Sequence, residues 1–399
     1  MSSNHPRRWP FLWAATAAIA SAASLLAACG GGAADAPDSA AQAEAYSLGP
    51  IEGFGSVIVG GVRFDDSTAS VTDEDGNAFD RSALKLGMMV QIDAAAVDRA
   101  ASAALARRIR FGPEVVGPVS AVNAGASTMT VLGQTVLVTS STLFDDSLAG
   151  GLPAVQVGDI VQVNGILDTG GGRIVATRID ERPAAPAYFL RGVVAALDSG
   201  AKTLRIGSEL ISFADLPGVP AALANDSIVR VVLRTTQVGG AWVAVRLAMG
   251  PRLPDAVPHA HIHGIVTAFT SATSFLVNGL PVDASNATFP DGQAGIVRGA
   301  RVEVEGRVVG GVLVATQVEI DSRRLGEIFK RLFELHGELS GIDTTAKTFA
   351  LRGLTVWYGG TVEYRNGTEA DLSNGDRVAI RGKLSADRTR LEASRIEFK

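Results

Sequence analysis

The sequence has few of the residue types on which protein chemistry most often depends. Its 399 residues include one cysteine, Cys29, five histidines and only 6% aromatic residues. A chain with one cysteine cannot form an internal disulfide or a multi-cysteine metal site. Its net charge is −5, whereas nucleic-acid binding requires clustered positive charge and stacking aromatics. Nucleic acid is therefore not an expected partner.

The N-terminus has the layout of an export signal. Arg7 and Arg8 precede an uncharged, alanine-rich segment that runs from Trp9 to Ala28 and ends at Cys29. The segment is short of the roughly 20 strongly apolar residues that a bilayer span requires. We therefore interpret it as a cleaved signal and not as a permanent transmembrane helix.

The end of this segment, Leu26-Ala27-Ala28-Cys29, resembles the lipobox of bacterial lipoproteins. The resemblance implies cleavage before Cys29 and lipid modification of that cysteine. Several acyl chains on one residue would anchor the protein stably, because each buried methylene adds about 0.8 kcal/mol. Gly30 after the cysteine resembles the pattern of lipoproteins that reach the Gram-negative outer membrane. The expected location is the cell envelope, with Cys29 as the membrane anchor in the outer membrane.

The segment after the cysteine has the composition of a linker. Residues 29–46 are mainly glycine, alanine and polar residues, and they show no apolar periodicity. Such a stretch has too little apolar surface to bury. We expect a disordered tether between the lipid and a folded body.

The rest of the chain consists of internal repeats. A glycine followed by alternating small and apolar residues recurs every 72–75 residues, at Gly117, Gly192, Gly264 and Gly337. A turn followed by an alternating strand is a second recurring element, and a strand that starts with alanine closes each unit. Together with a more divergent first copy, these landmarks give five repeats.

Each repeat has the pattern of a small β-domain. Short stretches alternate between apolar and other residues and are separated by glycine, asparagine and aspartate turns. Five such strands in about 70 residues suit a small barrel of the OB kind. We expect an all-β fold: a tandem array of five small OB-like antiparallel β-barrels, one short connecting helix and a disordered N-terminal tether. In the last repeat the strands are expected near residues 333–342, 348–351, 354–358, 377–382 and 390–398.

The landmarks follow one another in a fixed order. A glycine-led strand precedes an apolar strand with a turn such as Asn278-Gly279, then a Gly-Asp-x-Val turn and a closing Ala-x-x-Ile strand. Over residues 47–399 this order resembles the domain of unknown function 5666 family. Its members are mostly bacterial lipoproteins with several such modules, so the resemblance implies a fold but no activity. The third repeat has Asn225-Asp226 at the Gly-Asp position, which predicts a distorted barrel.

Proline-bearing spacers and the repeats together set the expected boundaries. Asp321-Ser322 can cap a short helix whose apolar residues share one face. The parts expected are a signal peptide (1–28), a lipidated tether (29–46), five β-modules (47–112, 113–182, 187–249, 259–321 and 333–399) and a connecting helix (322–332).

One cluster of histidines could hold a metal ion. His259, His261 and His263 alternate along an expected strand, so all three would point to one face with adjacent rings close enough to share a metal. The other repeats have polar residues at the position of His263, which favours a solvated strand edge that happens to carry histidines. The sequence therefore allows two interpretations of these histidines, a metal site and a solvated strand edge.

Nothing in the sequence indicates catalysis. A serine nucleophile needs a histidine base held by an acid. After removal of the signal peptide, His336 is the only histidine besides His259, His261 and His263. We expect no enzymatic activity, no catalytic residues and no cofactor.

Two functions agree with these features. The first is a structural or protein-docking scaffold of the cell envelope, and the second is an array of modules that binds a glycan or another envelope polymer. A glycan-binding array should place exposed aromatics such as Trp242, Trp357 or Tyr358 in a shared groove. A scaffold should bury or scatter them, which is the arrangement we expect.

Overall fold

The computed structural model describes residues 44–54, 56–98, 100–148, 150–321, 333–352, 354–385 and 390–399. The signal peptide, Cys29 and the expected connecting helix at 322–332 lie outside these residues. No helix of the described residues is long and apolar enough to cross a membrane. The helical segments within them are 3₁₀ turns of three residues each: Arg81–Ala83, Asp146–Leu148, Leu152–Ala154 and Glu369–Asp371.

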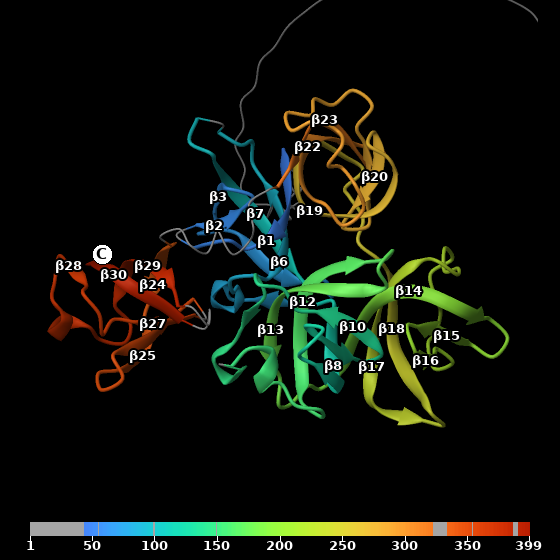
Figure 1. The fold of residues 1–399 in the computed structure, drawn as a ribbon, viewed down its shortest axis with the longest axis horizontal. Helices are drawn as coiled ribbons and strands as arrows, with labels where there is room; N and C mark the ends of the chain where they lie inside the picture. The colour runs from blue at the N-terminus through green and yellow to red at the C-terminus, as the bar shows by residue number, and fades with distance from the viewer. Residues whose placement is uncertain are drawn as a thin grey trace, which may run out of the picture. The chain divides into compact units, whose positions relative to one another are not determined.

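Module 2 shows the barrel topology completely (Figure 1). Its strands are β8 (Val115–Asn123), β9 (Thr128–Val131), β10 (Gln134–Leu137), β11 (Leu143–Phe144), β12 (Ile160–Asp168) and β13 (Arg173–Glu181). β8, β9 and β10 pair in antiparallel order, and β12 pairs antiparallel with both β13 and β8. A parallel pair between β10 and β13 closes the ring. The expected OB-like barrel is confirmed, but it is not purely antiparallel.

The strands of modules 3 and 4 form rings with the same pairing order, and in each ring a parallel pair between the third and fifth strands closes the barrel. Module 3 contains β14 (Tyr188–Asp198), β15 (Thr203–Ile206), β16 (Glu209–Ser212), β17 (Ile228–Val238) and β18 (Ala241–Met249). Module 4 contains β19 (Ala256–Ser271), β20 (Ser274–Val277), β21 (Leu280–Asp283), β22 (Arg301–Val309) and β23 (Val312–Ile320).

Modules 1 and 5 are variants of this ring with extra short strands. Module 1 contains β1 (Ala45–Pro50), β2 (Val57–Val59), β3 (Val62–Asp65), β4 (Ser70–Asp73), β5 (Ala78–Phe79), β6 (Met89–Ala94) and β7 (Ala103–Phe111). Module 5 contains β24 (Phe333–Glu338), β25 (Ser340–Asp343), β26 (Thr348–Leu351), β27 (Leu354–Trp357), β28 (Glu363–Arg365), β29 (Arg377–Leu384) and β30 (Arg390–Phe398), so the strands expected in the last repeat are confirmed.

The divergent turn of the third repeat does not open its barrel. Asp226 adopts a left-handed backbone with φ of 67°, as Gly375 does with φ of 96° in module 5. The Asn225 carboxamide accepts a hydrogen bond from the Leu197 amide at 2.9 Å. Aspartate and asparagine tolerate the left-handed region better than most residues, so the turn keeps its geometry without glycine. Register shifts occur between β14 and β15 and between β17 and β18, but the corresponding strand pairs of modules 2 and 4 show shifts too, so the expected distortion is not observed.

The glycine that leads each repeat makes room for the next hairpin. In module 4, a Cβ on Gly264 would overlap the Asn278 side chain. Asn278 and Gly279 both have positive φ, of 53° and 78°, as a tight two-residue hairpin turn requires. The Asn278 side chain accepts a hydrogen bond from the Ile265 amide at 3.0 Å. The landmark glycine therefore lets the first strand pass closely over this turn.

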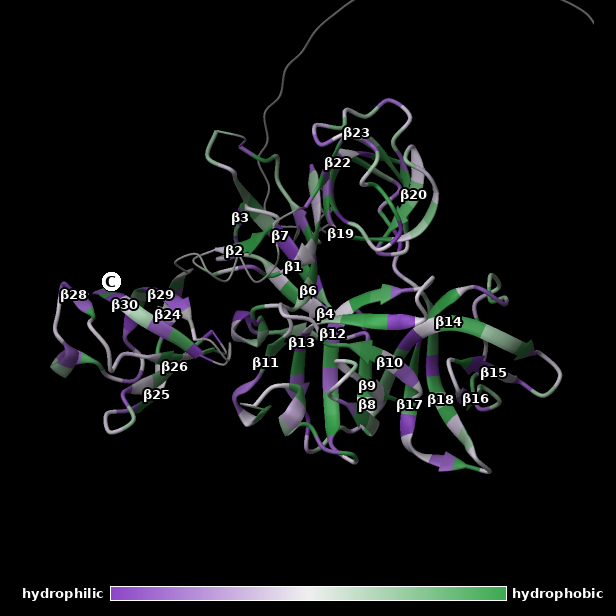
Figure 2. Cartoon of the chain, viewed as in Figure 1, coloured by the Kyte–Doolittle hydropathy of each residue, from purple (hydrophilic) through white to green (hydrophobic). Residues whose placement is uncertain are grey.

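The barrels are filled by alternate residues of their strands, and Figure 2 shows hydrophobic and hydrophilic residues alternating along many of them. In module 4, Ile262, Val266, Val304 and Val318 are at most 1% exposed. Full burial of such a side chain contributes about 1.5–3 kcal/mol.

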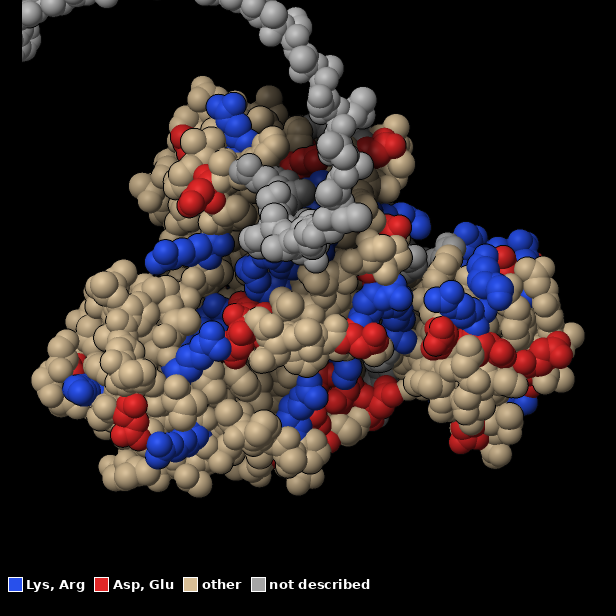
Figure 3. Space-filling model, turned by 180° about the vertical axis from the view of Figure 1, so that it is seen from behind, with Lys and Arg blue, Asp and Glu red and all other residues tan. Residues whose placement is uncertain are grey.

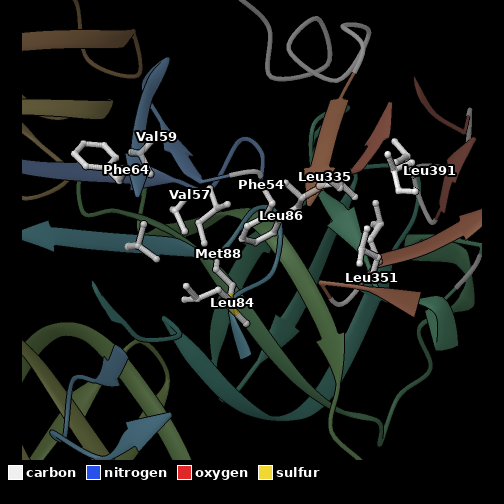
Figure 4. Packing of buried hydrophobic residues seen from close by; sticks show 14 of the residues in the cluster. Phe54, Val57, Val59, Phe64, Leu84, Leu86, Met88, Leu335, Leu351 and Leu391 are labelled. Carbon is white, nitrogen blue, oxygen red and sulfur yellow. The ribbon is translucent and has the colours of Figure 1, made fainter. Parts of the chain in front are cut away.

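A second hydrophobic cluster includes buried residues of both module 1 and module 5. Figure 4 labels ten of them: Phe54, Val57, Val59, Phe64, Leu84, Leu86, Met88, Leu335, Leu351 and Leu391.

Strand pairing also connects modules to one another. β1 of module 1 pairs in parallel with β19 of module 4, and β8 of module 2 pairs with β14 of module 3. β1 begins at Ala45, and both Ala45 and Tyr46 are at most 4% exposed. The tether expected over residues 29–46 therefore extends two residues too far. Its last residues are ordered because they add to a strand more than 200 residues away.

Candidate functional site

The three histidines of the expected cluster lie on β19, between β1 on one side and β22 on the other. Ile262 points into the barrel core of module 4, so the residues beside it point toward module 1. His259 is exposed, His261 is partly buried, and His263 is only 2% exposed. The three rings therefore share one side of the strand but have three different environments.

His261 gathers with two glutamates of the neighbouring strand. Its Nε2 lies 2.8 Å from Oε1 of Glu303, and Glu305 is its direct partner in the β19–β22 register. One side-chain donor atom from each of these three residues lies within 4.8 Å of the others. Among the described residues this is the group of His, Asp and Glu side chains with metal-binding geometry. We call it the His261 cluster.

The His261 cluster borders a cleft between modules 1 and 4. The cleft has a volume of about 740 Å³, and its lining includes Ser47, Phe64, His259, His261 and Glu305. Gly60 of the β2–β3 turn lies against the His261 ring, since a Cβ at that position would overlap the imidazole. Module 1 therefore holds the ring against β22 while the cleft leaves the cluster accessible.

His263 has a different partner set from His261. Its Nε2 lies 2.7 Å from Oδ2 of Asp321, and its Nδ1 lies 3.4 Å from Oε1 of Glu52 in module 1. Arg301 Nε lies 3.9 Å from the same Asp321 oxygen. Burial lowers the pKa of His263, but hydrogen bonding to Asp321 and Glu52 outweighs it and raises the pKa to about 9. At neutral pH this histidine is a buried cation between two carboxylates.

The structure does not bring His259, His261 and His263 together as one ligand set. His263 is held by Glu52 and Asp321, and the His261 cluster takes one histidine of the three. Sequence reasoning missed Glu303 and Glu305. The signal that could have found them is their own alternation about Val304 in a strand of the same repeat.

A second charged cluster joins module 1 to module 3. Glu74, in the turn after β4, contacts Arg191 Nη2 at 2.6 Å and Arg230 Nε at 3.1 Å. Asp75 contacts Arg230 Nη2 at 3.0 Å and Arg246 Nη1 at 3.0 Å. The guanidinium groups of Arg191 and Arg230 come from β14 and β17, and both residues are 5% exposed.

The Glu74 turn is a tight turn whose charged side chains also form the contact with module 3. Asp73 Oδ1 accepts hydrogen bonds from the amides of Asp75 and Asn77 at 2.8 and 2.9 Å, which shapes the turn. Burial lowers the pKa of Arg191, but Glu114 and Glu74 outweigh it and raise the pKa above its ordinary value. Arg191 therefore stays charged inside the interface.

A third charged cluster joins modules 1 and 2. Arg178, which is 2% exposed, makes hydrogen bonds from Nε and Nη2 to Asp180 at 2.7–2.9 Å, and its Nη1 donates to the Leu86 carbonyl at 3.3 Å. Lys85 of module 1 reaches Asp180 at 3.1 Å. Burial raises the pKa of Asp180, but Arg178 and Lys85 outweigh it and lower the pKa. Module 1 thus meets modules 2, 3 and 4 through buried charges.

The closed rings define the described chain as a tandem array of small OB-like β-barrels. Residues 116–180, 263–319 and 336–397 match the sequence profile of the family described as Domain of unknown function (DUF5666). Within these three stretches the match confirms the resemblance expected from the landmarks. The first and third repeats, which diverge most in sequence, lie outside the matched regions.

Other comparisons add little. No curated protein sequence matches the chain. Among solved structures, Drosophila Unr CSD456 is 16% identical over 45% of this chain and 87% of that chain, with a TM-score of 0.16.

Proposed function

We propose that the protein is a non-enzymatic scaffold of the bacterial cell envelope, anchored in the outer membrane through a lipidated Cys29. The observation that carries the proposal is the use of buried charge. Glu74, His263 and Asp180 each form an ion pair with a residue of another module. Such contacts define the relative placement of modules more than they add stability, and fixed placement is what a docking scaffold requires.

The aromatic residues also favour a scaffold over a glycan-binding array. Trp242 is 9% exposed, and its Nε1 donates to Glu209 at 2.7 Å. Tyr358 is 2% exposed, and the guanidinium of Arg390 lies over the Trp357 ring, 5.1 Å from its centroid. These side chains belong to modules 3 and 5 and do not form a shared stacking groove.

The distribution of charge agrees with a protein partner and not with nucleic acid. On the face shown in Figure 3, Lys and Arg side chains lie among Asp and Glu side chains without a continuous basic stripe. Nucleic-acid binding requires such a stripe to neutralise phosphates. Mixed charge suits protein docking, where complementary pairs set orientation and specificity.

The anchor is tested by metabolic labelling in a Gram-negative host. Labelled palmitate should enter the full-length protein and be lost completely in the Cys29→Ala variant, which has no other thiol to acylate. The wild type should fractionate with the outer membrane. Equal labelling of the variant, or recovery of the labelled wild type in the cytoplasmic membrane, would contradict the proposed anchor or its location.

Docking is tested by photo-cross-linking in the same cells. A photoreactive amino acid is placed at the exposed valines Val157, Val238 and Val309, which are 67%, 62% and 52% exposed, and at the fully buried Val163 as the matched control. A scaffold should give discrete adducts with envelope proteins from at least one exposed position and none from Val163. Adducts with glycan alone would favour the polymer-binding array, and no adduct from any exposed position would contradict docking at these modules.

A further inference from the structure

The His261 cluster has the donor set of a metal site. His261 supplies an imidazole nitrogen, and Glu303 and Glu305 supply carboxylate oxygens, with the three donor atoms within 4.8 Å of one another. One nitrogen and two oxygen donors match ions of intermediate softness, above all Zn²⁺, better than Ca²⁺ or Mg²⁺, which prefer oxygen alone.

Strand register makes this arrangement rigid. His261 is the Cα partner of Glu305, and Glu303 lies two residues along the same antiparallel strand. All three side chains therefore project from one face of two hydrogen-bonded strands. Donors fixed on strands need little ordering on metal binding, which favours affinity.

A neighbouring side chain provides independent support. Ser47 is the Cα partner of His261 in the parallel β1–β19 pair and lines the same cleft. It is 2% exposed, yet its Oγ has no hydrogen-bond partner among the described residues. A buried hydroxyl without a partner is destabilising, and a polar ligand in the cleft, such as a metal-bound water, would satisfy it.

We propose that His261, Glu303 and Glu305 bind a single divalent transition-metal ion, with Zn²⁺ as the best fit, at the border of the cleft between modules 1 and 4. Three protein ligands leave one position of a tetrahedral ion open. Since His261 and Glu305 line the cleft, an additional ligand can reach that position from it. His259 and His263 are not part of the site.

The test is calorimetric titration of the full-length, detergent-solubilised protein with Zn²⁺ after treatment with a chelator. We expect saturable binding of one ion with a Kd of about 1 μM or tighter. Loss of a ligand should weaken binding by at least about 100-fold for His261→Gln and Glu303→Gln, and by at least about 10-fold for the exposed Glu305→Gln. All variants keep Cys29, so any contribution of that residue cancels.

The matched control is His259→Gln, which alters a histidine of the same strand and the same cleft outside the donor set. It should leave the Kd within about twofold. Circular dichroism melting of each metal-free variant separates loss of a ligand from loss of fold, and Glu305→Gln provides a surface position for this comparison. Three results would overturn the site: no saturable binding below about 100 μM, a Kd unchanged by Glu305→Gln in a folded protein, or an equal loss in His259→Gln.

Discussion

Replacing Glu74 by glutamine should lower the free energy of unfolding by about 3–5 kcal/mol, the range seen when one partner of a buried ion pair is removed. Glutamine keeps the size of the side chain and removes only its charge. Arg191 and Arg230, both 5% exposed, would then share fewer carboxylates. The change is measured by urea denaturation followed by circular dichroism.

A double-mutant cycle identifies the contact responsible. Arg191→Met should be destabilising alone, but combined with Glu74→Gln it should cost less than the sum of the two changes, by about 1–3 kcal/mol. The matched control is Arg234→Met, because Arg234 forms a 3.0 Å ion pair with Asp215 in the same module with both side chains more than half exposed. Such a pair contributes little. If Glu74→Gln behaved like Arg234→Met, the Glu74 turn would be a surface turn only.

The sequence predicted the repeated barrel because the information for each strand is local. In module 5 the alternation around Phe349 and Val356 places both residues in the core, at 1% and 0% exposure. The parallel pairs were not predicted. They join the third and fifth strands of a barrel across a long connection, as Val282 and Leu313 show in module 4, and no local pattern specifies such a partner.

The lack of local information about distant partners also explains which contacts of the histidines and of Glu74 the sequence did not predict. Alternation correctly placed His261 and His263 on one side of β19, but module 1 covers that side because β1 pairs with β19 across more than 200 residues. The partners of Glu74, Arg191 and Arg230, likewise lie far from it in sequence. Contacts between modules depend on surface complementarity, which a single sequence does not reveal.

Replacing His263 by glutamine should have an effect of similar size through a different module interface. Glu52 and Asp321 would then face each other with no imidazolium between them, and their side chains are only 7% and 0% exposed. Removing one partner of a buried ion pair costs about 3–5 kcal/mol. The midpoint of urea unfolding at pH 7 should fall accordingly, while His259→Gln, on the exposed part of the same strand, should leave it unchanged.

The pH profile distinguishes lost charge from lost packing. The folded protein binds the His263 proton more tightly than the unfolded chain, since its pKa rises from 6.5 to about 9 on folding. This contribution is fully present below about pH 6.5 and is lost as the pH rises through about 9, which amounts to about 3 kcal/mol at most. Wild-type stability should therefore decline across that interval, with a chelator present so that metal binding at the His261 cluster does not contribute.

In His263→Gln that decline should disappear, because the titrating group is gone, and the wild-type and variant profiles should converge toward pH 9–10. A variant that is destabilised equally at pH 6 and pH 9 would instead indicate that His263 acts by its shape. The convergence matters for the proposed scaffold, because it would show that the protonated imidazole of His263, between the carboxylates of Glu52 and Asp321, helps to hold modules 1 and 4 together. Their relative placement would then depend on the pH of the compartment in which the protein resides.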